Sequence, residues 1–499
     1  MAYNTKSHTY YRFAPLWKKC SDVCKGGEDA IKINGEYYLP RPDGMEEPDY
    51  QGYLSRAEFF NASGRTLDGV HGLMFRKDVT IDVPEQYRPY LDNVDGKGTD
   101  IYKFISECTY ETLVTGWGGV LVDAPTAENI RTKAEAEKQG IAPYLQYFKA
   151  KDIFNWHYAD IGRKKTLDRA CLHEKIESRN GDDFTYTLRD RYHLLMLNDN
   201  FEYTEIIKNQ EGSTTSEFTP RKNGASFNHI PFYTLPNIEP EKPMFLDLVN
   251  LNLHWYIKSA DLENGAHWTG VPTPYILGYE PEVEYDENGN EKPRKPIYLG
   301  GSSMLTFPQG VTGIGYLEFA GSGLSQLQSM LDTDEERMAI LGARIISQEK
   351  KGVESAETAK IHRAGENSVI ATFANNMSNV FKKILIEYLS WCSESELNPD
   401  DITVKINTDY EVSQMSSAEL ASMVSLWQSG GISKRVLFSN LKEGEVIPNE
   451  YSFEDLETEI ADEKESSRVF NFATQTMETP DNNLENNTNT AEEKENGTV

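Results

Sequence analysis

The residue patterns that could support chemistry in this 499-residue chain are few, and each lacks part of its signature. Gly96-Lys97-Gly98-Thr99 lacks the upstream glycine of a phosphate-binding loop and follows no clear strand, so we predict a turn. Gly116-Trp117-Gly118-Gly119 precedes an apolar run, whereas the glycines of a dinucleotide-binding fingerprint follow a strand and open a helix. We therefore predict that these glycines form a tight corner between a helix and a strand.

Candidate metal ligands and acid–base groups are also incomplete. The acidic residues at 286–290 resemble a calcium-binding loop, but the glycine is misplaced and Ile297 stands where a bidentate glutamate would bind. His173 has no second histidine at metalloprotease spacing, and Cys20 and Cys24 have no second pair to complete a zinc site. We predict no metal, no cofactor and no catalytic residue. The sequence leaves open an enzyme whose acidic residues meet only in the folded chain.

The net charge of -29 argues against tight wrapping of nucleic acid, because that affinity comes mainly from Lys and Arg neutralising phosphates. It does not exclude DNA contact, since a channel through which DNA slides needs a surface that barely holds the backbone. A hydrophobic fraction of 38% is typical of a globular protein. No apolar run reaches the roughly 20 residues that span a bilayer. The first residues do not resemble a signal peptide, so we expect folding in a cytoplasm.

Both helices and strands are expected among the elements that would position a site, which predicts an α+β fold. Asp100 is predicted to cap a helix that ends at Gly116 and leads into a buried strand at 120–122. Asn34-Gly35 between short strand-like runs predicts a hairpin. Short alternating runs between residues 143 and 235 predict an antiparallel meander.

Two helices with apolar residues three and four apart are predicted at 245–268 and 324–341, and Asp334 is the one interruption of the second. A Gly- and Pro-rich β segment at 271–323 separates them. A long helix follows at 355–392, then a strand at 402–406 and helices at 416–427 and 434–441. Residues past about 469 have almost no apolar side chains, so we predict disorder there.

Several of these segments, in this order and spacing, resemble one group of tailed-bacteriophage portal proteins, which are head-to-tail connectors. The resemblance covers about residues 10–465. The segments that carry it are 56–77, the corner at 116–123, 143–147 through Asn155-Trp156, Glu357-Thr358-Ala359 with its long helix, and Leu426 through 430–433 to Leu441.

The resemblance implies a ring at one capsid vertex, typically of twelve subunits, through which double-stranded DNA is packaged and ejected and to which the tail attaches. The implied partners are the terminase large subunit, head-completion or adaptor proteins, tail proteins, and capsid and scaffold proteins, with no membrane. The protein would be made in the host bacterial cytoplasm and end in the virion.

The resemblance also implies a portal-like architecture with named parts. These are a wing (1–244), a first stem helix (245–269), a β-containing clip (270–323), a second stem helix (324–342), a tunnel loop (343–354), a long wing helix with a return strand (355–410), a helical crown (411–468) and a disordered acidic tail (469–499). Lys350 and Lys351 of the tunnel loop would face the lumen and touch DNA phosphates transiently.

Two other interpretations compete with the portal. One is a soluble cytoplasmic enzyme with a β-rich substrate domain, which predicts a compact oligomer of low order with a deep polar pocket. The other is a structural adaptor without a DNA channel. For Lys350 and Lys351 the competing interpretation is a solvated surface loop.

Overall fold

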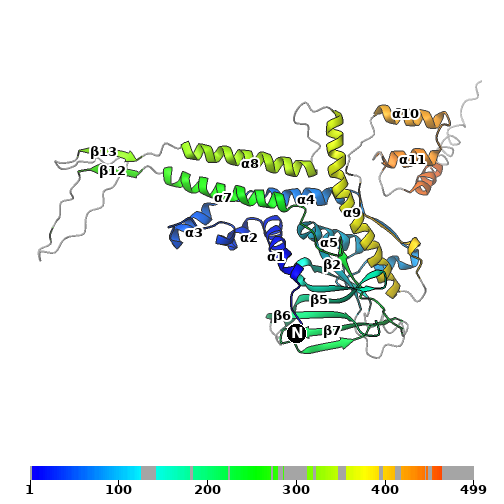
Figure 1. Ribbon diagram of the computed structural model, residues 1–499. Helices are drawn as coiled ribbons and strands as arrows, with labels where there is room; N and C mark the ends of the chain where they lie inside the picture. The colour runs from blue at the N-terminus through cyan, green and yellow to red at the C-terminus, as the bar shows by residue number, and fades with distance from the viewer. Residues whose placement is uncertain are drawn as a thin grey trace, which may run out of the picture. The chain divides into compact units, whose positions relative to one another are not determined.

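The computed structural model describes residues 3–124, 142–179, 184–222, 225–270, 273–278, 285, 312–317, 322–346, 356–392, 397–408, 410, 417–443, 446–447 and 452–462. The chain divides into two compact units, Met1–Tyr410 and Glu411–Val499. Helices and strands mix within the first unit, so the expected α+β class is confirmed (Figure 1). Within the described ranges, no helix is both long and apolar enough to cross a membrane.

Helices, and not the expected hairpin, form the N-terminal region. Its segments are α1 (His8–Ser21), a π-helical turn (Asp22–Gly26), α2 (Gly27–Ile33), a 3-10 turn (Gly35–Tyr37), α3 (Glu47–Arg56) and α4 (Ala62–Met74). The hairpin predicted at Asn34-Gly35 is wrong, because Asn34 ends α2 and its side-chain amide donates back to the Ala30 carbonyl at 2.7 Å. The alternation of Ile31 and Ile33 resembled a strand, but the helix buries Ile31 and leaves Ile33 84% exposed.

The predicted corner at Gly116 is confirmed. The Asp100 carboxylate accepts a hydrogen bond from the Lys103 backbone N–H at 3.0 Å and so caps α5 (Ile101–Thr115). The helix ends at Gly116 with φ +76°, a left-handed conformation that glycine adopts without steric cost. A Cβ at Gly116 would lie 3.1 Å from the Glu241 carbonyl oxygen, so the corner also lets the segment before α7 approach closely.

Two antiparallel sheets follow the corner. The first has the order β11-β2-β3, with β2 (Gly118–Asp123) buried at every residue between β3 (Tyr144–Lys149) and β11 (Phe232–Leu235). The second has the order β4-β5-β6-β7-β8, so the predicted antiparallel meander is confirmed. Its strands are β4 (Ile153–Ile161), β5 (Lys164–Arg179), β6 (Tyr186–Leu197), β7 (Tyr203–Asn209) and β8 (Thr214–Phe218), followed by the small hairpin of β9 (Arg221–Lys222) and β10 (Ala225–Ser226).

The predicted long helix is confirmed as α9 (Ala356–Cys392). Its buried side chains follow the helical spacing seen in the sequence and include Ile370, Met377, Phe381, Ile384 and Tyr388. After a 3-10 turn (Pro399–Asp401), β14 (Thr403–Lys405) pairs antiparallel with β1 (Thr80–Asp82). The end of the first unit therefore returns to its N-terminal part.

The two helices predicted from heptad spacing are confirmed as α7 (Leu246–Thr269) and α8 (Ser322–Ile346). They lie side by side, and β12 (Thr273–Leu277) and β13 (Gly313–Leu317) come between them in the chain (Figure 1). The loop was expected at 343–354, but its predicted start is too early, because residues 343–346 still belong to α8. No glycine or proline follows Gly342 before Ile346, so nothing in the sequence ends the helix sooner.

The second unit contains α10 (Ser417–Gln428), α11 (Lys434–Glu443) and a further helix at 453–462. The helices predicted at 416–427 and 434–441 are confirmed, whereas the third has no counterpart among the predicted helices. The Phe438 and Phe453 rings meet edge to face at 5.5 Å, and this apolar contact joins α11 to the last helix. The tail predicted to be disordered at 469–499 lies outside the described residues.

Gly116 and Gly96 provide a matched pair of substitutions. Gly96 has φ +71° and open space around it, so Gly96→Ala should lower the free energy of unfolding by about 1 kcal/mol through backbone strain alone. Gly116→Ala adds the contact with the Glu241 carbonyl and should lower it by about 2 kcal/mol or more. Urea unfolding followed by circular dichroism measures both. Equal effects would contradict the close approach at the corner.

Candidate functional site

The candidate site is the antiparallel pair of α7 and α8, called the arm from here on. The first turns of α7 are buried in the core of the first unit, where Leu248, Val249 and Tyr256 are almost fully covered. Its last turns are exposed, and Trp268 is 67% accessible to solvent. The arm therefore begins in the core and continues into solvent (Figure 1).

The heptad spacing of α8 defines the seam of the arm. Leu331 and Met338 are each 3% exposed. At the outer end of the seam a Cβ on Gly265 of α7 would lie 2.6 Å from Leu324 Cδ2, so the glycine allows close packing there. At the inner end Gly342 packs on Thr66 of α4 in the same way, with 2.8 Å from a Cβ to Thr66 Oγ1.

Asp334 occupies the one charged position of this apolar spacing. It is 2% exposed, and its Oδ2 accepts a hydrogen bond from Lys258 Nζ of α7 at 2.5 Å. Arg337, which is largely exposed, adds a longer contact of 3.4 Å to Oδ1. A buried charge without a partner is strongly destabilising. If α8 shifted along α7, Asp334 would lose Lys258 and become such a charge, so the observed alignment of the two helices is favoured. Asp334 therefore fixes the register of the arm, as single polar seam residues do in coiled coils.

A buried asparagine ties α7 to the start of α4. Asn252 is fully buried, and its Oδ1 accepts hydrogen bonds from the backbone N–H and the hydroxyl of Ser63, both at 3.0 Å. Its Nδ2 donates to the Phe60 carbonyl at 2.8 Å. These three hydrogen bonds satisfy the amide oxygen and one amide N–H of Asn252. Rotation of α7 about its axis would break them and leave buried polar groups unsatisfied.

Helix α3 holds the next turns of α7. The Tyr53 hydroxyl donates to Asp261 Oδ1 at 2.7 Å, and Arg56 Nη2 donates to Asn264 Oδ1 at 2.8 Å. Across the arm, Trp255 Nε1 donates to Glu335 Oε1 of α8 at 3.1 Å. The root of α7 is thus fixed by α3 and α4, and by its partner helix α8.

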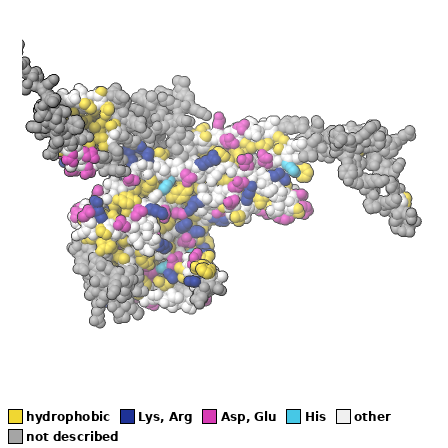
Figure 2. All heavy atoms as spheres, turned by 180° about the vertical axis from the view of Figure 1, so that it is seen from behind, with side chains coloured by type: hydrophobic (Ala, Val, Ile, Leu, Met, Phe, Trp, Pro, Cys, Tyr) yellow, Lys and Arg dark blue, Asp and Glu magenta, His cyan; other side chains and the backbone are white. Residues whose placement is uncertain are grey.

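The outward residues of α8 stay in solvent in the single chain. Met330 and Ile340 are 40% and 49% exposed, and the exposed acidic residues Asp332 and Glu336 lie between them in the sequence. Figure 2 shows acidic and basic side chains interspersed along the arm on the face opposite to Figure 1. This surface therefore carries exposed apolar side chains together with charges of both signs.

The outer end of the arm is a two-stranded antiparallel sheet. β12 pairs with β13 from Thr273 with Leu317 to Leu277 with Gly313. Tyr275 and Leu277 are 43% and 55% exposed. The β segment predicted between the two helices therefore contains a pair of strands, and most of residues 279–311 lie outside the described ranges.

The residues that sequence analysis singled out are not gathered in one place. Lys350 and Lys351 lie outside the described residues, as do 286–290. Gly96 to Thr99 form the predicted turn, where the Asp95 carboxylate accepts from the Lys97 and Thr99 backbone N–H groups at 2.8 and 3.1 Å. Burial raises the pKa of the Cys20 thiol to about 12, so this thiol is unreactive near neutral pH. The described part of the chain holds no group of three ligands suited to a metal ion.

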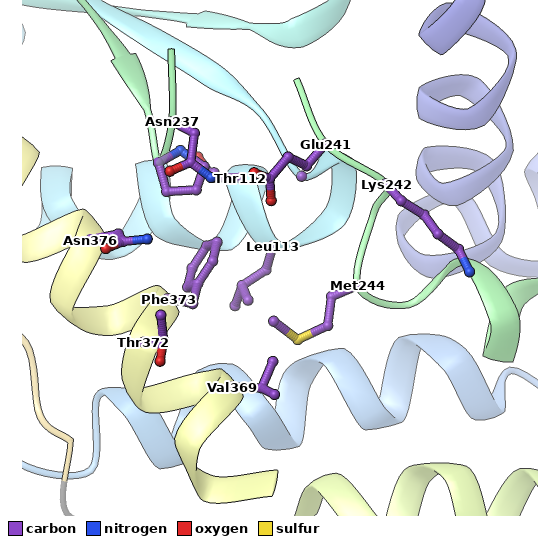
Figure 3. Close-up of a pocket in the computed structure, with 12 residues that line it drawn as sticks. Thr112, Leu113, Asn237, Glu241, Lys242, Met244, Val369, Thr372, Phe373 and Asn376 are labelled. Atoms are coloured by element: carbon purple, nitrogen blue, oxygen red, sulfur yellow. The ribbon is translucent and has the colours of Figure 1, made fainter. Parts of the chain in front are cut away.

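A pocket of about 360 Å³ lies between α5, the segment before α7, and α9 (Figure 3). Apolar side chains form much of its wall, and the amides of Asn237 and Asn376 lie beside them. Among the described lining residues the charged ones are Glu241 and Lys242, and Lys242 is paired with Asp247 at 2.8 Å. The described lining has no histidine, cysteine or pair of carboxylates, so these residues offer shape and amide groups but not acid–base or nucleophilic chemistry.

The sequence indicated one of the functional residues of the arm but not their partners. Asp334 was visible as the interruption of an apolar heptad spacing, which is the signal that could have marked it as a buried polar residue. Lys258, Asn252 and Tyr53 gave no such signal, because their partners lie 76 or more residues away in the chain.

Comparison with known proteins gives a family match and similar solved structures, among them two particle necks. Residues 244–392, which span the arm and α9, match a family described as a domain of unknown function (DUF4055). No curated protein matches the chain. The chain is similar to the neck of a native GTA particle computed with C12 symmetry, with 11% identity and a TM-score of 0.35 over 81% of this chain and 95% of that one. It is also similar to the neck of an empty GTA particle computed with C6 symmetry, with 10% identity and a TM-score of 0.36 over 82% and 98%.

Asp334 is the residue of the seam whose role is most directly testable. Asp334→Ala leaves the Lys258 ammonium unpaired, and because that side chain is 21% exposed and can reach water we expect a loss of about 2 kcal/mol in the free energy of unfolding. The double variant Asp334→Leu with Lys258→Met should be as stable as the native chain or more stable. Urea midpoints followed by helical circular dichroism give these values.

Asp332→Ala is the matched control for this test. Asp332 lies on the exposed side of the same helix, accepts a hydrogen bond from Gln328 at 2.9 Å, and should change stability by less than about 0.5 kcal/mol. An Asp334→Ala variant as stable as Asp332→Ala would contradict a buried, paired Asp334.

Proposed function

We propose that this protein is a portal, the ring-shaped head-to-tail connector of a tailed bacteriophage. The observation that carries this proposal is the arm, whose inner seam is buried and fixed in register by Asp334 and Lys258 while the outward residues of α8 remain in solvent. A surface of this kind on every copy can contact a different surface of the next copy. Such heterologous contacts close into a ring when the rotation between copies divides a full turn.

Each part of the chain then takes a place in the portal plan. α7 and α8 are the stem helices, β12 and β13 belong to the clip, and α9 is the long wing helix. The N-terminal helices and the two sheets form the wing, and the helices of the second unit form the crown. The tunnel loop starts after Ile346 and not at residue 343, because α8 continues that far.

The charge of the chain is compatible with passage of DNA. A net charge of -29 gives a protein that on average repels phosphates. Double-stranded DNA would therefore move through the ring without being held. Lys350 and Lys351 would supply sparse cationic contacts, enough to touch the backbone and too few to bind it tightly.

The proposed partners follow from this position in the particle. They are other copies of the chain in a ring of about twelve, the terminase large subunit during packaging, head-completion or adaptor and tail proteins afterwards, and capsid and scaffold proteins around the wing. The protein would be made in the host cytoplasm and become part of the virion.

Assembly of the purified protein tests the ring. Native mass spectrometry and negative-stain images should show a ring of about twelve copies with an axial hole. Met330→Glu combined with Ile340→Glu should dissociate the ring, because each new charge would be desolvated at the contact, while helical content stays unchanged. Ile33→Glu makes the same change at a residue that is 84% exposed outside the arm and should leave the ring intact. A strictly monomeric native protein without an axial hole would reject the proposal.

The lysines of the tunnel loop have their own test. Lys350→Ala with Lys351→Ala should reduce the yield of DNA-filled particles several-fold without changing ring assembly, because the contacts to the moving phosphates are lost. Lys97→Ala with Lys383→Ala removes two exposed lysines elsewhere and should leave the yield unchanged. An unchanged yield in the loop variant would contradict the proposed contact of Lys350 and Lys351 with DNA. It would not bear on the proposed ring.

A further inference from the structure

Charged side chains lie buried where the β11-β2-β3 sheet packs against the five-stranded meander β4-β5-β6-β7-β8. Gln146 Nε2 of β3 donates to Glu174 Oε2 of β5 at 2.7 Å across this contact, and the Phe148 ring meets the His193 ring at 5.9 Å. The members of this inter-sheet cluster are Asp123 on β2, Tyr144 and Gln146 on β3, Glu174 on β5, Arg191 and His193 on β6, and Tyr203 and Glu205 on β7.

His193 lies between two carboxyl groups in this cluster. It is 2% exposed, its Nδ1 lies 2.6 Å from Glu205 Oε1, and its Nε2 lies 3.0 Å from Glu174 Oε1. When both carboxyl groups are ionised they only accept hydrogen bonds, so each ring nitrogen then carries a proton and the ring is an imidazolium. Burial alone would lower the pKa of His193, but the hydrogen bonds to Glu174 and Glu205 outweigh burial and raise it to about 9.

The charges of the cluster balance only when Asp123 is neutral. Arg191 Nη1 donates to Glu174 at 3.1 Å, so two cations, Arg191 and His193, face two carboxylates, Glu174 and Glu205. Asp123 is a third carboxyl group and is 4% exposed. When it is ionised, the buried cluster has one negative charge without a partner.

Asp123 is held by neutral donors. The Tyr144 hydroxyl donates to Oδ2 at 2.6 Å and the Ala124 backbone N–H donates to Oδ1 at 2.8 Å. From the meander, Glu205 is the charge that opposes its ionisation and His193 the one that favours it. Burial, together with the Glu205 carboxylate, raises the pKa of Asp123 to about 7.

We propose that the inter-sheet cluster is a proton-dependent clasp, in which protonated Asp123 lets the two sheets pack closely and ionised Asp123 loosens the end of β2 against β7. The cluster lies within one chain, so the clasp does not depend on the proposed ring. A change of about one unit around neutral pH would alter how firmly the two sheets hold each other.

The direction of the pH effect follows from the raised pKa. A carboxyl group whose pKa in the folded chain lies above its ordinary value of 3.8 stabilises the fold through its bound proton. That contribution is complete below pH 3.8 and is lost as the pH rises through about 7. The packing of the two sheets should therefore weaken between acidic and neutral pH because of this residue.

Hydrogen exchange of the β2, β3 and β7 amides tests the clasp, with Asp123→Asn as a permanently neutral mimic of the protonated group. After correction for intrinsic exchange rates, the ratio of the native opening constant to that of Asp123→Asn should rise about tenfold from pH 6 to pH 8. A ratio that stays constant over this range would overturn the proposal, because a merely structural Asp123 would give the same difference at every pH.

His193→Gln provides a second variant in case Asp123→Asn fails to fold. Removing the imidazolium leaves the Glu205 charge opposite Asp123 without compensation, so the midpoint of the pH-dependent opening should move to a higher pH than in the native chain. His157→Gln is the control, because His157 is paired with Asp168 but its side chain is 67% exposed, and it should leave the midpoint in place. An unchanged midpoint in His193→Gln would also overturn the clasp.

Discussion

The buried ion pair between Lys258 and Asp334 is the constraint on which the arm depends. Removing two charges from water is costly, and their attraction repays that cost only when they meet in good geometry. The pair is therefore a device for specificity more than a source of net stability: it permits one alignment of α7 and α8 along an otherwise apolar seam. Asn252 and Tyr53 then fix that aligned pair to the N-terminal helices.

A fixed arm makes the outward side of α8 a defined surface. The seam buries Leu331, Asp334 and Met338, whereas Met330 and Ile340 lie off the seam and stay in solvent. In the proposed ring the next copy would cover these side chains. In the proposed portal, Asp334 fixes how α7 and α8 align, and that alignment sets the surface that each copy presents to the next copy around the DNA channel.

Local signals in the sequence predicted much of this fold. Asp100 before an apolar helical face and Gly116 after it specify a helix and its ends, and the heptad spacing of α7 and α8 specifies two helices with a shared seam. The prediction was wrong at Asn34-Gly35, where the same residues satisfy a hairpin and a helix end, and tertiary burial of Ile31 decides between them. Long-range partners such as Lys258 for Asp334 have no local signal, and neither do the residues that collect between the two sheets.

A cryo-EM reconstruction of the native assembly would show directly whether the arm lines a ring. We expect α7 and α8 of each copy around an axial passage, with Asp334 facing Lys258 within the copy and the outward side of α8 against its neighbour. A reconstruction in which that side of α8 faces bulk solvent away from any passage would contradict it.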